Sequence, residues 1–369
     1  MALEVETLAE SKYNVIDQIK ENQTLEFERI ANWIVAGSGN FEKTHDDGRY
    51  RDNCNTFRGA SACKDHVYKS LTLHYNHCNK MDCETCFIQA SSTRARELNG
   101  KLKELRKKAL KEGVKIGTVK HIALSPTKEL MKEILTDYDK FLKFRREFVV
   151  KTILEESGLF GGVLILDLWV KQCRTCGKKE YECSCETKDL KRVLSPHFHY
   201  IGYGYVLHAN DFREKFKDWV YVNFGSREDA YHTLFYTLTH CALWRKDDGK
   251  LKPAYKTTGF VSSKHLEPIH TVTKYIPHKC KVCKKPTRRI KKGLVITGGK
   301  FPHTIHVQLI DHELELGHEI RYKTLVRSYR IKNIEELREA VEINRVRYEK
   351  YKRKKKKTES IEKAGNGDG

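Results

Sequence analysis

Two histidines separated by one aromatic residue, His197-Phe198-His199, form the pair in this chain best suited to bind a metal ion. The apolar residues around them are typical of a β-strand, and side chains alternate between the two faces of a strand. We therefore expect His197 and His199 on one face, with Phe198 and Tyr200 on the other. Two neighbouring imidazoles can hold a divalent cation. Pro196 is expected at the entry to the strand, because a proline further in removes a ladder hydrogen bond.

A second candidate group lies on a predicted helix further along the chain. Ser226, with Asp229 three positions later, resembles a capping box, so the helix is expected to begin near residue 227. At the helical repeat, His232, Tyr236 and His240 share one face. The opposite, apolar face carries Leu234, Leu238 and Cys241. The pattern predicts a phenol between two imidazoles on the polar face, opposite a buried face.

Three segments, in this order along the chain, resemble the motifs of the HUH endonucleases, and in particular the rolling-circle replication initiators of archaeal plasmids and viruses. Residues 119–126, a predicted strand ending in Ser125-Pro126, resemble the first motif. His197-Phe198-His199 matches the second motif, and Tyr236 followed by His240 is similar to the third. The resemblance covers roughly residues 75–245. It implies an α+β fold with an RRM-like HUH nuclease core, in which helices flank a mostly antiparallel central sheet.

The resemblance also implies the reaction, which is site-specific nicking and strand transfer on single-stranded DNA. Tyr236 would be joined to the 5′ phosphate, leaving a 3′ hydroxyl for a polymerase to extend at a replication origin. Mn²⁺ or Mg²⁺ held by His197, His199 and His240 would bind the scissile phosphate and align it for in-line attack. The implied partners are single-stranded origin DNA and host replication proteins, including a helicase and a polymerase.

Several residues around this site have alternatives. Residues five apart on a regular helix diverge by about 140°, so Tyr231 and Tyr236 cannot both face the metal. Tyr236 is the predicted nucleophile, and Tyr231 is the alternative. His240 is the predicted third ligand, with His232 or the carboxylate of Asp167 as alternatives.

Two other functions fit the same motifs. A single-strand transposase or a conjugative relaxase would use identical chemistry on a different DNA target. A zinc-dependent nucleic-acid-binding protein without catalytic activity would use His197 and His199 for structure only.

The chain also contains 12 cysteines, most of them grouped with the spacing of zinc ligands. One group supplies four thiolates and is expected to bind a structural Zn²⁺. It lies in a loop predicted between two strands, over residues 171–190. Its members are Cys173, Cys176, Cys183 and Cys185.

Two further cysteine groups are incomplete by spacing alone. Cys78, Cys83 and Cys86 need a fourth zinc ligand, and the nearby candidates are Cys54, Cys63, His66, His74 and His77. Cys280 and Cys283 either share that site or form their own with His278 or His270. Cys241 is expected to be a buried small apolar residue rather than a ligand.

Composition favours a polyanionic partner. Lys and Arg number 70 against 49 Asp and Glu, which leaves a net charge of +21. Aromatic residues in 200–205 and 219–221 are candidates either for stacking on bases or for the core. Lys120 and His121 are expected to be solvated strand residues, with contact to DNA as the alternative. The sequence contains no apolar segment of membrane-spanning length, so we expect a cytoplasmic protein without a membrane partner.

We expect four successive segments: an N-terminal region with the first cysteine group and a long helix (1–112), the HUH domain (113–275), a strand-containing segment with the Cys280 pair (276–330), and a helix with a basic tail (331–369). Within them, helices are predicted over 84–111, 127–155 and 334–351, and strands over 164–168, 304–309 and 319–322. The lysine-rich run 352–357 is expected to be too charged to fold.

Overall fold

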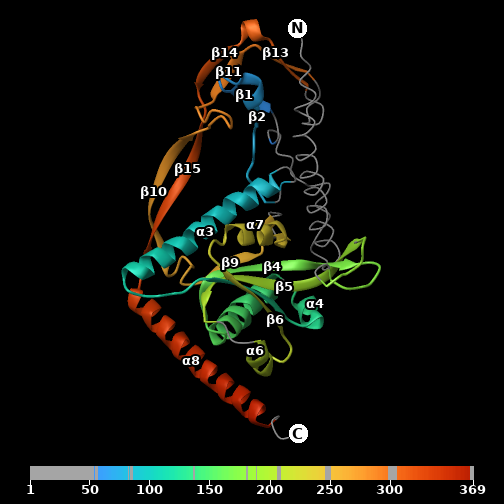
Figure 1. Cartoon of the computed structure of the whole chain (residues 1–369), viewed down its shortest axis with the longest axis vertical. Helices are drawn as coiled ribbons and strands as arrows, with labels where there is room; N and C mark the ends of the chain where they lie inside the picture. The colour runs from blue at the N-terminus through green and yellow to red at the C-terminus, as the bar shows by residue number, and fades with distance from the viewer. Residues whose placement is uncertain are drawn as a thin grey trace. The chain divides into compact units, whose positions relative to one another are not determined.

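The computed structural model describes residues 54, 57–81, 83, 86–135, 138–179, 182–187, 189–205, 209–245, 251–297 and 306–365. Within them, the chain forms two compact units (Figure 1). The first unit contains residues 54–90 and 270–327, and the second contains residues 91–269 and 328–365. The first cysteine group and the Cys280 pair, which the sequence placed in separate segments, therefore belong to one unit. Most of the N-terminal region expected over 1–112 lies outside the described residues.

The second unit is built on a five-stranded antiparallel sheet with the strand order β6-β3-β5-β4-β9. The strands are β3 (Val119–Ser125), β4 (Leu159–Cys173), β5 (Leu190–Gly204), β6 (Val220–Arg227) and β9 (Tyr255–Gly259). A short hairpin of β7 (Leu243–Arg245) and β8 (Leu251–Pro253) follows the tyrosine helix. The expected α+β class with an antiparallel sheet is confirmed.

Helices cover both faces of this sheet (Figure 1). One face packs against α3 and α7, and the hydroxyl of Tyr203 on β5 donates to the carbonyl of Leu102 on α3 at 2.9 Å. The other face packs against α4, α5 and α6, and Phe198 on β5 stacks on Phe141 of α5. The helices are α3 (Phe87–Lys111), α4 (Lys128–Ile134), α5 (Tyr138–Lys143), α6 (Ala209–Lys215) and α7 (Tyr231–Thr239). The alternation predicted for residues 197–200 is therefore present.

The single helix expected over 127–155 is divided into three elements. Thr127 caps α4 by accepting a hydrogen bond from the backbone of Leu130, and α5 is followed by a π-helix, η1 (Phe144–Leu154). Val149 and Ile153 of η1 are fully buried, so the predicted apolar face exists although the helix is not continuous.

The tyrosine-rich part of β5 is core rather than a DNA-binding surface. Tyr200 is fully buried, and its hydroxyl donates to the carbonyl of Tyr203 and accepts from the backbone of Gly161. Its ring fits because Gly202 pairs with Gly162 on β4, and a Cβ on either glycine would lie 2.7 Å from an atom of Tyr200. Trp219 and Tyr221 are buried too. The residues proposed from sequence for base stacking are therefore unavailable, apart from the partly buried Tyr205.

Pro196 lies within β5 and not at its entry. The pairing with β4 shifts register here, because Asp167 pairs with His197 whereas Trp169 pairs with Leu194. Such a β-bulge leaves a residue outside the ladder, so it accepts a proline that has no N–H to donate.

The first unit contains a four-stranded antiparallel sheet with the order β14-β11-β1-β2. Its small apolar core contains Ala60, Ala62 and Ile290. The elements are β1 (Phe57–Ala62), α2 (Val67–Ser70), β2 (Thr72–Tyr75), β11 (Arg288–Lys292), η3 (Asp311–Glu313) and β14 (Glu315–Glu319), with a hairpin of β12 (Leu294–Thr297) and β13 (His306–Leu309). Strands β10 (Leu266–Pro277) and β15 (Arg321–Ile331) pair in a two-stranded sheet.

The C-terminal helix α8 (Ile334–Gly365) is longer than expected and includes the lysine-rich run. Lysine has a high helix propensity, and Glu349 and Glu359 flank the run within about one helical turn of its lysines, so charge alone does not prevent the helix. Within the second unit, the N-terminal part of α8 contacts other elements through Arg338, which donates to the carbonyl of Glu112, and through the ring of Tyr348, which lies near that of Tyr205. No helix in the described part of the chain combines the length and the apolar character needed to cross a bilayer.

Candidate metal centre and tyrosine helix

Asp167, His197 and His199 meet on the face of the central sheet that α3 and α7 cover. Asp167 on β4 pairs with His197 on β5, so adjacent strands hold the group rigidly. The Nε2 atoms of the two histidines are 3.1 Å apart, and Oδ2 of Asp167 lies 3.9 Å from Nε2 of His197 and 3.8 Å from Nε2 of His199. A triangle with these sides has a circumscribed radius of about 2.1 Å, which is the bond length of first-row divalent cations and Mg²⁺ to nitrogen and oxygen ligands. The three donor atoms therefore fit around one cation.

The protonation of the group also suits a cation. Nδ1 of His197 donates to the carbonyl of Ser195 at 2.7 Å, which leaves the lone pair on Nε2. Burial lowers the pKa of His197 and keeps the imidazole neutral. Burial raises the pKa of Asp167, but the neighbouring His199, His197 and His240 outweigh it and lower the pKa to about 2. Two imidazoles and one carboxylate form a donor set for Mn²⁺, Fe²⁺ or Zn²⁺, and less strongly for Mg²⁺.

His121 supports this group from the neighbouring strand β3. The sequence suggested a solvated residue, but His121 is 8% exposed and its Nε2 lies 3.0 Å from Nδ1 of His199. If Nε2 of His199 binds a cation, its Nδ1 carries the proton, and Nε2 of His121 is the acceptor. Burial and the adjacent His199 lower the pKa of His121 to about 3, so it is neutral and able to accept. The sequence signal for this inward orientation was strand alternation, which places His121 on the same face as the apolar Val119 and Ala123.

We expect His121→Leu to weaken Mn²⁺ binding about 10- to 100-fold, because the variant removes the acceptor that sets the tautomer of His199. His121→Gln, whose amide oxygen can accept, should remain closer to the wild type. Calorimetric titration of Mn²⁺ measures both values. Unchanged affinity in the leucine variant of a normally folded protein would show that His121 does not orient His199.

The tyrosine helix begins later than the sequence indicated. Strand β6 continues through Ser226, whose hydroxyl accepts a hydrogen bond from Lys120, and α7 begins at Tyr231. The N-cap is Ala230, and the carboxylate of Asp229 just before it accepts a hydrogen bond from the backbone of Tyr231, the first helical residue, at 2.7 Å. His240 is the C-terminal cap, outside helical geometry. The expected capping box at Ser226 was therefore wrong, although Asp229 does act at this end.

Tyr236 lies on the exposed face of α7, in the last turns before the residue that is bridged to Asp167. Its side chain is 59% exposed, and its ring centroid lies 4.5 Å from that of His240. The next residue, Cys241, forms a β-bridge with Asp167, so the end of α7 is tied to a residue of the metal group. His240 is also close enough to Asp167 to lower its pKa. The donor atoms grouped with those of His197 and His199 come from Asp167, which was the alternative for the third ligand. His240, the predicted third ligand, is not in this group.

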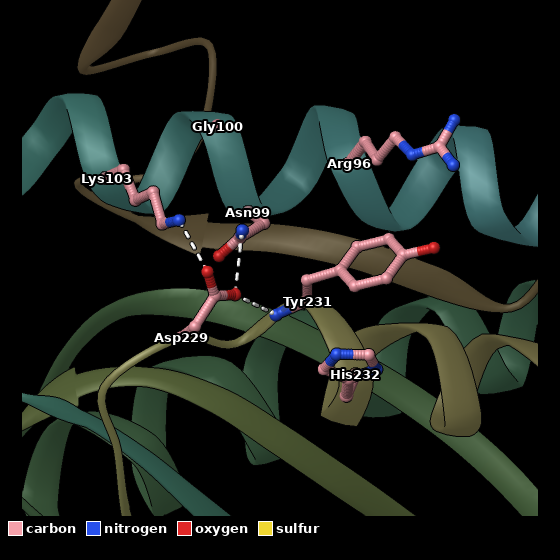
Figure 2. A pocket seen from close by; sticks show the side chains of 7 residues that line it. All are labelled: Arg96, Asn99, Gly100, Lys103, Asp229, Tyr231 and His232. Carbon is pink, nitrogen blue, oxygen red and sulfur yellow. Dashed lines mark hydrogen bonds and ion pairs between the residues drawn. The ribbon is translucent and has the colours of Figure 1, made fainter. Parts of the chain in front are cut away.

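Tyr231 and His232 belong to a different surface. The hydroxyl of Tyr231 is hydrogen-bonded to Ser92 of α3 at 2.9 Å, and the guanidinium of Arg96 lies 5.8 Å from the centre of its ring. Figure 2 shows Tyr231 and His232 beside Asp229, which is hydrogen-bonded to two residues of α3. These alternatives for the nucleophile and the third ligand therefore line a pocket against α3, and neither is part of the metal group. The side chains of Leu234, Leu238 and Cys241 are buried, as predicted.

Three clusters of four ligands are consistent with zinc sites. The excursion between β4 and β5 brings together its four predicted thiolates, Cys173, Cys176, Cys183 and Cys185. The structure also identifies the ligands that spacing left undetermined. Cys54 completes the group of Cys78, Cys83 and Cys86, with its sulfur 3.2 Å from that of Cys86. The pair Cys280 and Cys283 neither shares that site nor uses His278 or His270, and it is completed by Cys63 and His66.

The cluster with Cys280 joins chain segments that are distant in sequence, because the sulfurs of Cys63 and Cys283 lie 3.5 Å apart across 220 residues. We expect Cys280→Ser to remove one of three zinc ions per chain and to lower the melting temperature, since structural zinc sites stabilise folded domains directly. Elemental analysis and calorimetry measure the two effects. Cys241→Ala, at a buried cysteine outside the clusters, should leave the zinc content unchanged. Three zinc ions in the Cys280→Ser protein would contradict this ligand set.

Comparisons with models of protein families, with curated proteins and with solved structures found no match to this chain. The candidate site therefore depends on its own geometry: two histidines and an aspartate that fit one cation, and a tyrosine on a helix whose end is bridged to that aspartate.

Proposed function

We propose that the protein is a metal-dependent endonuclease of the HUH type, with an RRM-like nuclease core, that nicks single-stranded DNA through a 5′-phosphotyrosine intermediate. The main support is the geometry of the metal group, in which Asp167, His197 and His199 surround a point suited to a cation. The exposed Tyr236, five residues before the Cys241 that bridges to Asp167, is the nucleophile in this proposal.

The proposed reaction transfers a phosphoryl group to the tyrosine. A bound cation supplies charge neutralisation at the non-bridging oxygens of the scissile phosphate. The phenolic oxygen of Tyr236 forms a bond to phosphorus, and the bond from phosphorus to the 3′ oxygen breaks. The phenolic proton passes to the imidazole of His240, whose ring is adjacent, and the departing 3′ oxygen takes a proton from solvent. In this proposal Asp167 takes the third ligand position, for which the helical spacing had indicated His240.

The intermediate retains the energy of the phosphodiester bond, so the reverse reaction can join strands without ATP. This combination suits the initiation of rolling-circle replication at an origin, where a host polymerase extends the free 3′ hydroxyl and a helicase opens the duplex. A single-strand transposase or a relaxase would use the same site on another target. The net charge of +21 supports a nucleic-acid substrate in each case.

The decisive experiment incubates the protein with labelled single-stranded DNA from its replicon in the presence of Mn²⁺, Mg²⁺, Fe²⁺ or Zn²⁺. We expect a covalent protein–DNA adduct that survives denaturation and disappears with EDTA. Mass spectrometry of the tryptic digest should identify a phosphotyrosyl peptide that contains Tyr236. If DNA is bound but no adduct forms with any target or metal, the protein is instead a zinc-dependent nucleic-acid-binding protein.

A further inference from the structure

We propose that the outward side chains of strand β6, Val220, Val222 and Phe224, form a stacking surface for unpaired bases next to the metal group. We call these three residues the β6 platform. The proposal deepens the proposed function and rests on it, because it names the surface that holds the single strand beside the cleavage site. It replaces the aromatic residues favoured by the sequence, most of which are buried.

The platform belongs to the same face of the sheet as the metal ligands. Val222 pairs with Ala123 of β3, and Ala123 pairs with His199 of β5, so these three side chains form one row across the sheet. The platform side chains are 55%, 40% and 45% exposed, in chain order, whereas Tyr221 between them is 2% exposed. Strand β6 is the edge of the described sheet, so this row ends in solvent.

Phe224 is directly continuous with the metal group. Its ring stacks on that of His121 with a centroid distance of 4.6 Å and an interplanar angle of 25°, and it lies 6.4 Å from the ring of His199. One face of the Phe224 ring is therefore covered by the imidazole that supports His199. A base stacked on the exposed part of the ring would belong to a nucleotide close to the scissile phosphate.

The charge around the platform favours a polyanion over an apolar partner. Arg227 follows the platform on β6, donates to the carbonyl of Phe224 at 2.9 Å and reaches Thr233 of α7 at 3.3 Å. It also acts electrostatically on His121, which places its positive charge between the platform and the tyrosine helix. Exposed apolar and aromatic side chains beside a cationic group are the usual combination for single-stranded nucleic acid, in which bases stack and phosphates are neutralised.

The test measures the affinity of full-length protein for a fluorescent single-stranded oligonucleotide in EDTA, so that no cleavage occurs. We expect Phe224→Ala to weaken binding about 5- to 100-fold, the range for loss of one aromatic stacking contact. Phe224→Trp should retain or improve affinity, and Phe224→Leu should resemble the alanine variant because it is apolar without a π face. Phe148→Ala is the matched control, since Phe148 is also a partly exposed phenylalanine but packs against Phe144 and Trp219.

The outcomes separate this proposal from the proposed function. Reduced affinity in Phe224→Ala supports the platform even if the wild type forms no covalent adduct. Wild-type affinity in Phe224→Ala overturns the platform even if the adduct forms normally. If the variant instead changes the oligomeric state in sedimentation experiments and leaves DNA affinity unchanged, the edge strand is a contact between copies of the chain, and the platform is likewise overturned.

Discussion

Replacing Tyr236 with phenylalanine is expected to abolish the covalent protein–DNA adduct while single-strand binding persists. The substitution removes only the phenolic oxygen, and the ring that lies against His240 remains. Loss of the nucleophile lowers the rate by at least about 10³-fold, because the phenylalanine ring carries no oxygen that can attack the phosphate. Denaturing electrophoresis of the labelled adduct gives the rate, and fluorescence anisotropy gives the affinity.

Tyr231→Phe is the matched control, because it removes a phenolic oxygen from the same helix. That oxygen is hydrogen-bonded to Ser92 of α3 and lies on a surface separate from the metal group. We expect near-normal adduct formation in this variant. An adduct that persists in Tyr236→Phe and is lost in Tyr231→Phe would mean that the other tyrosine is the nucleophile and that α7 rotates on binding DNA.

Replacing His197 with alanine is expected to remove metal-dependent cleavage. The variant loses one of three donor atoms and leaves the carboxylate of Asp167 with a single imidazole neighbour in the group. Because loss of a supporting residue alone weakens metal binding 10- to 100-fold, loss of a ligand should weaken Mn²⁺ binding by about 100-fold or more. Titration of Mn²⁺ by calorimetry and adduct formation across a range of Mn²⁺ concentrations measure the effect.

A purely structural role for His197 would give a different result. In that case the variant would lose stability while the remaining folded protein kept its Mn²⁺ affinity. Zinc content and thermal denaturation of His197→Ala therefore accompany the titration, with His270→Ala as a control at an exposed histidine of β10. We expect normal zinc content in both variants, and weakened Mn²⁺ binding in His197→Ala only.

Local pattern was sufficient for several parts of the site. The alternation of a strand placed His197 and His199 on one face, and the helical repeat placed Leu234 and Leu238 on the buried face of α7. The four thiolates of the excursion between β4 and β5 were predictable because they lie within a few residues of one another. Helix boundaries were less certain, since Ser226 is held in β6 by its pairing with Lys120, which no local pattern indicates.

The candidate reactive and metal-binding groups, namely the histidine pair, the tyrosine helix and the cysteine groups, were predictable because spacing along one strand, helix or loop sets which side chains share a face. The distant residues that join them were found only in the folded chain. Pairing of β4 with β5 brought Asp167 to the histidines, pairing of β3 with β5 brought His121 behind His199, and Cys63 met Cys283 across 220 residues. Strand register and the meeting of distant chain segments are set by packing over the whole molecule. Contacts of this kind therefore follow from the fold and not from the spacing of residues along the sequence.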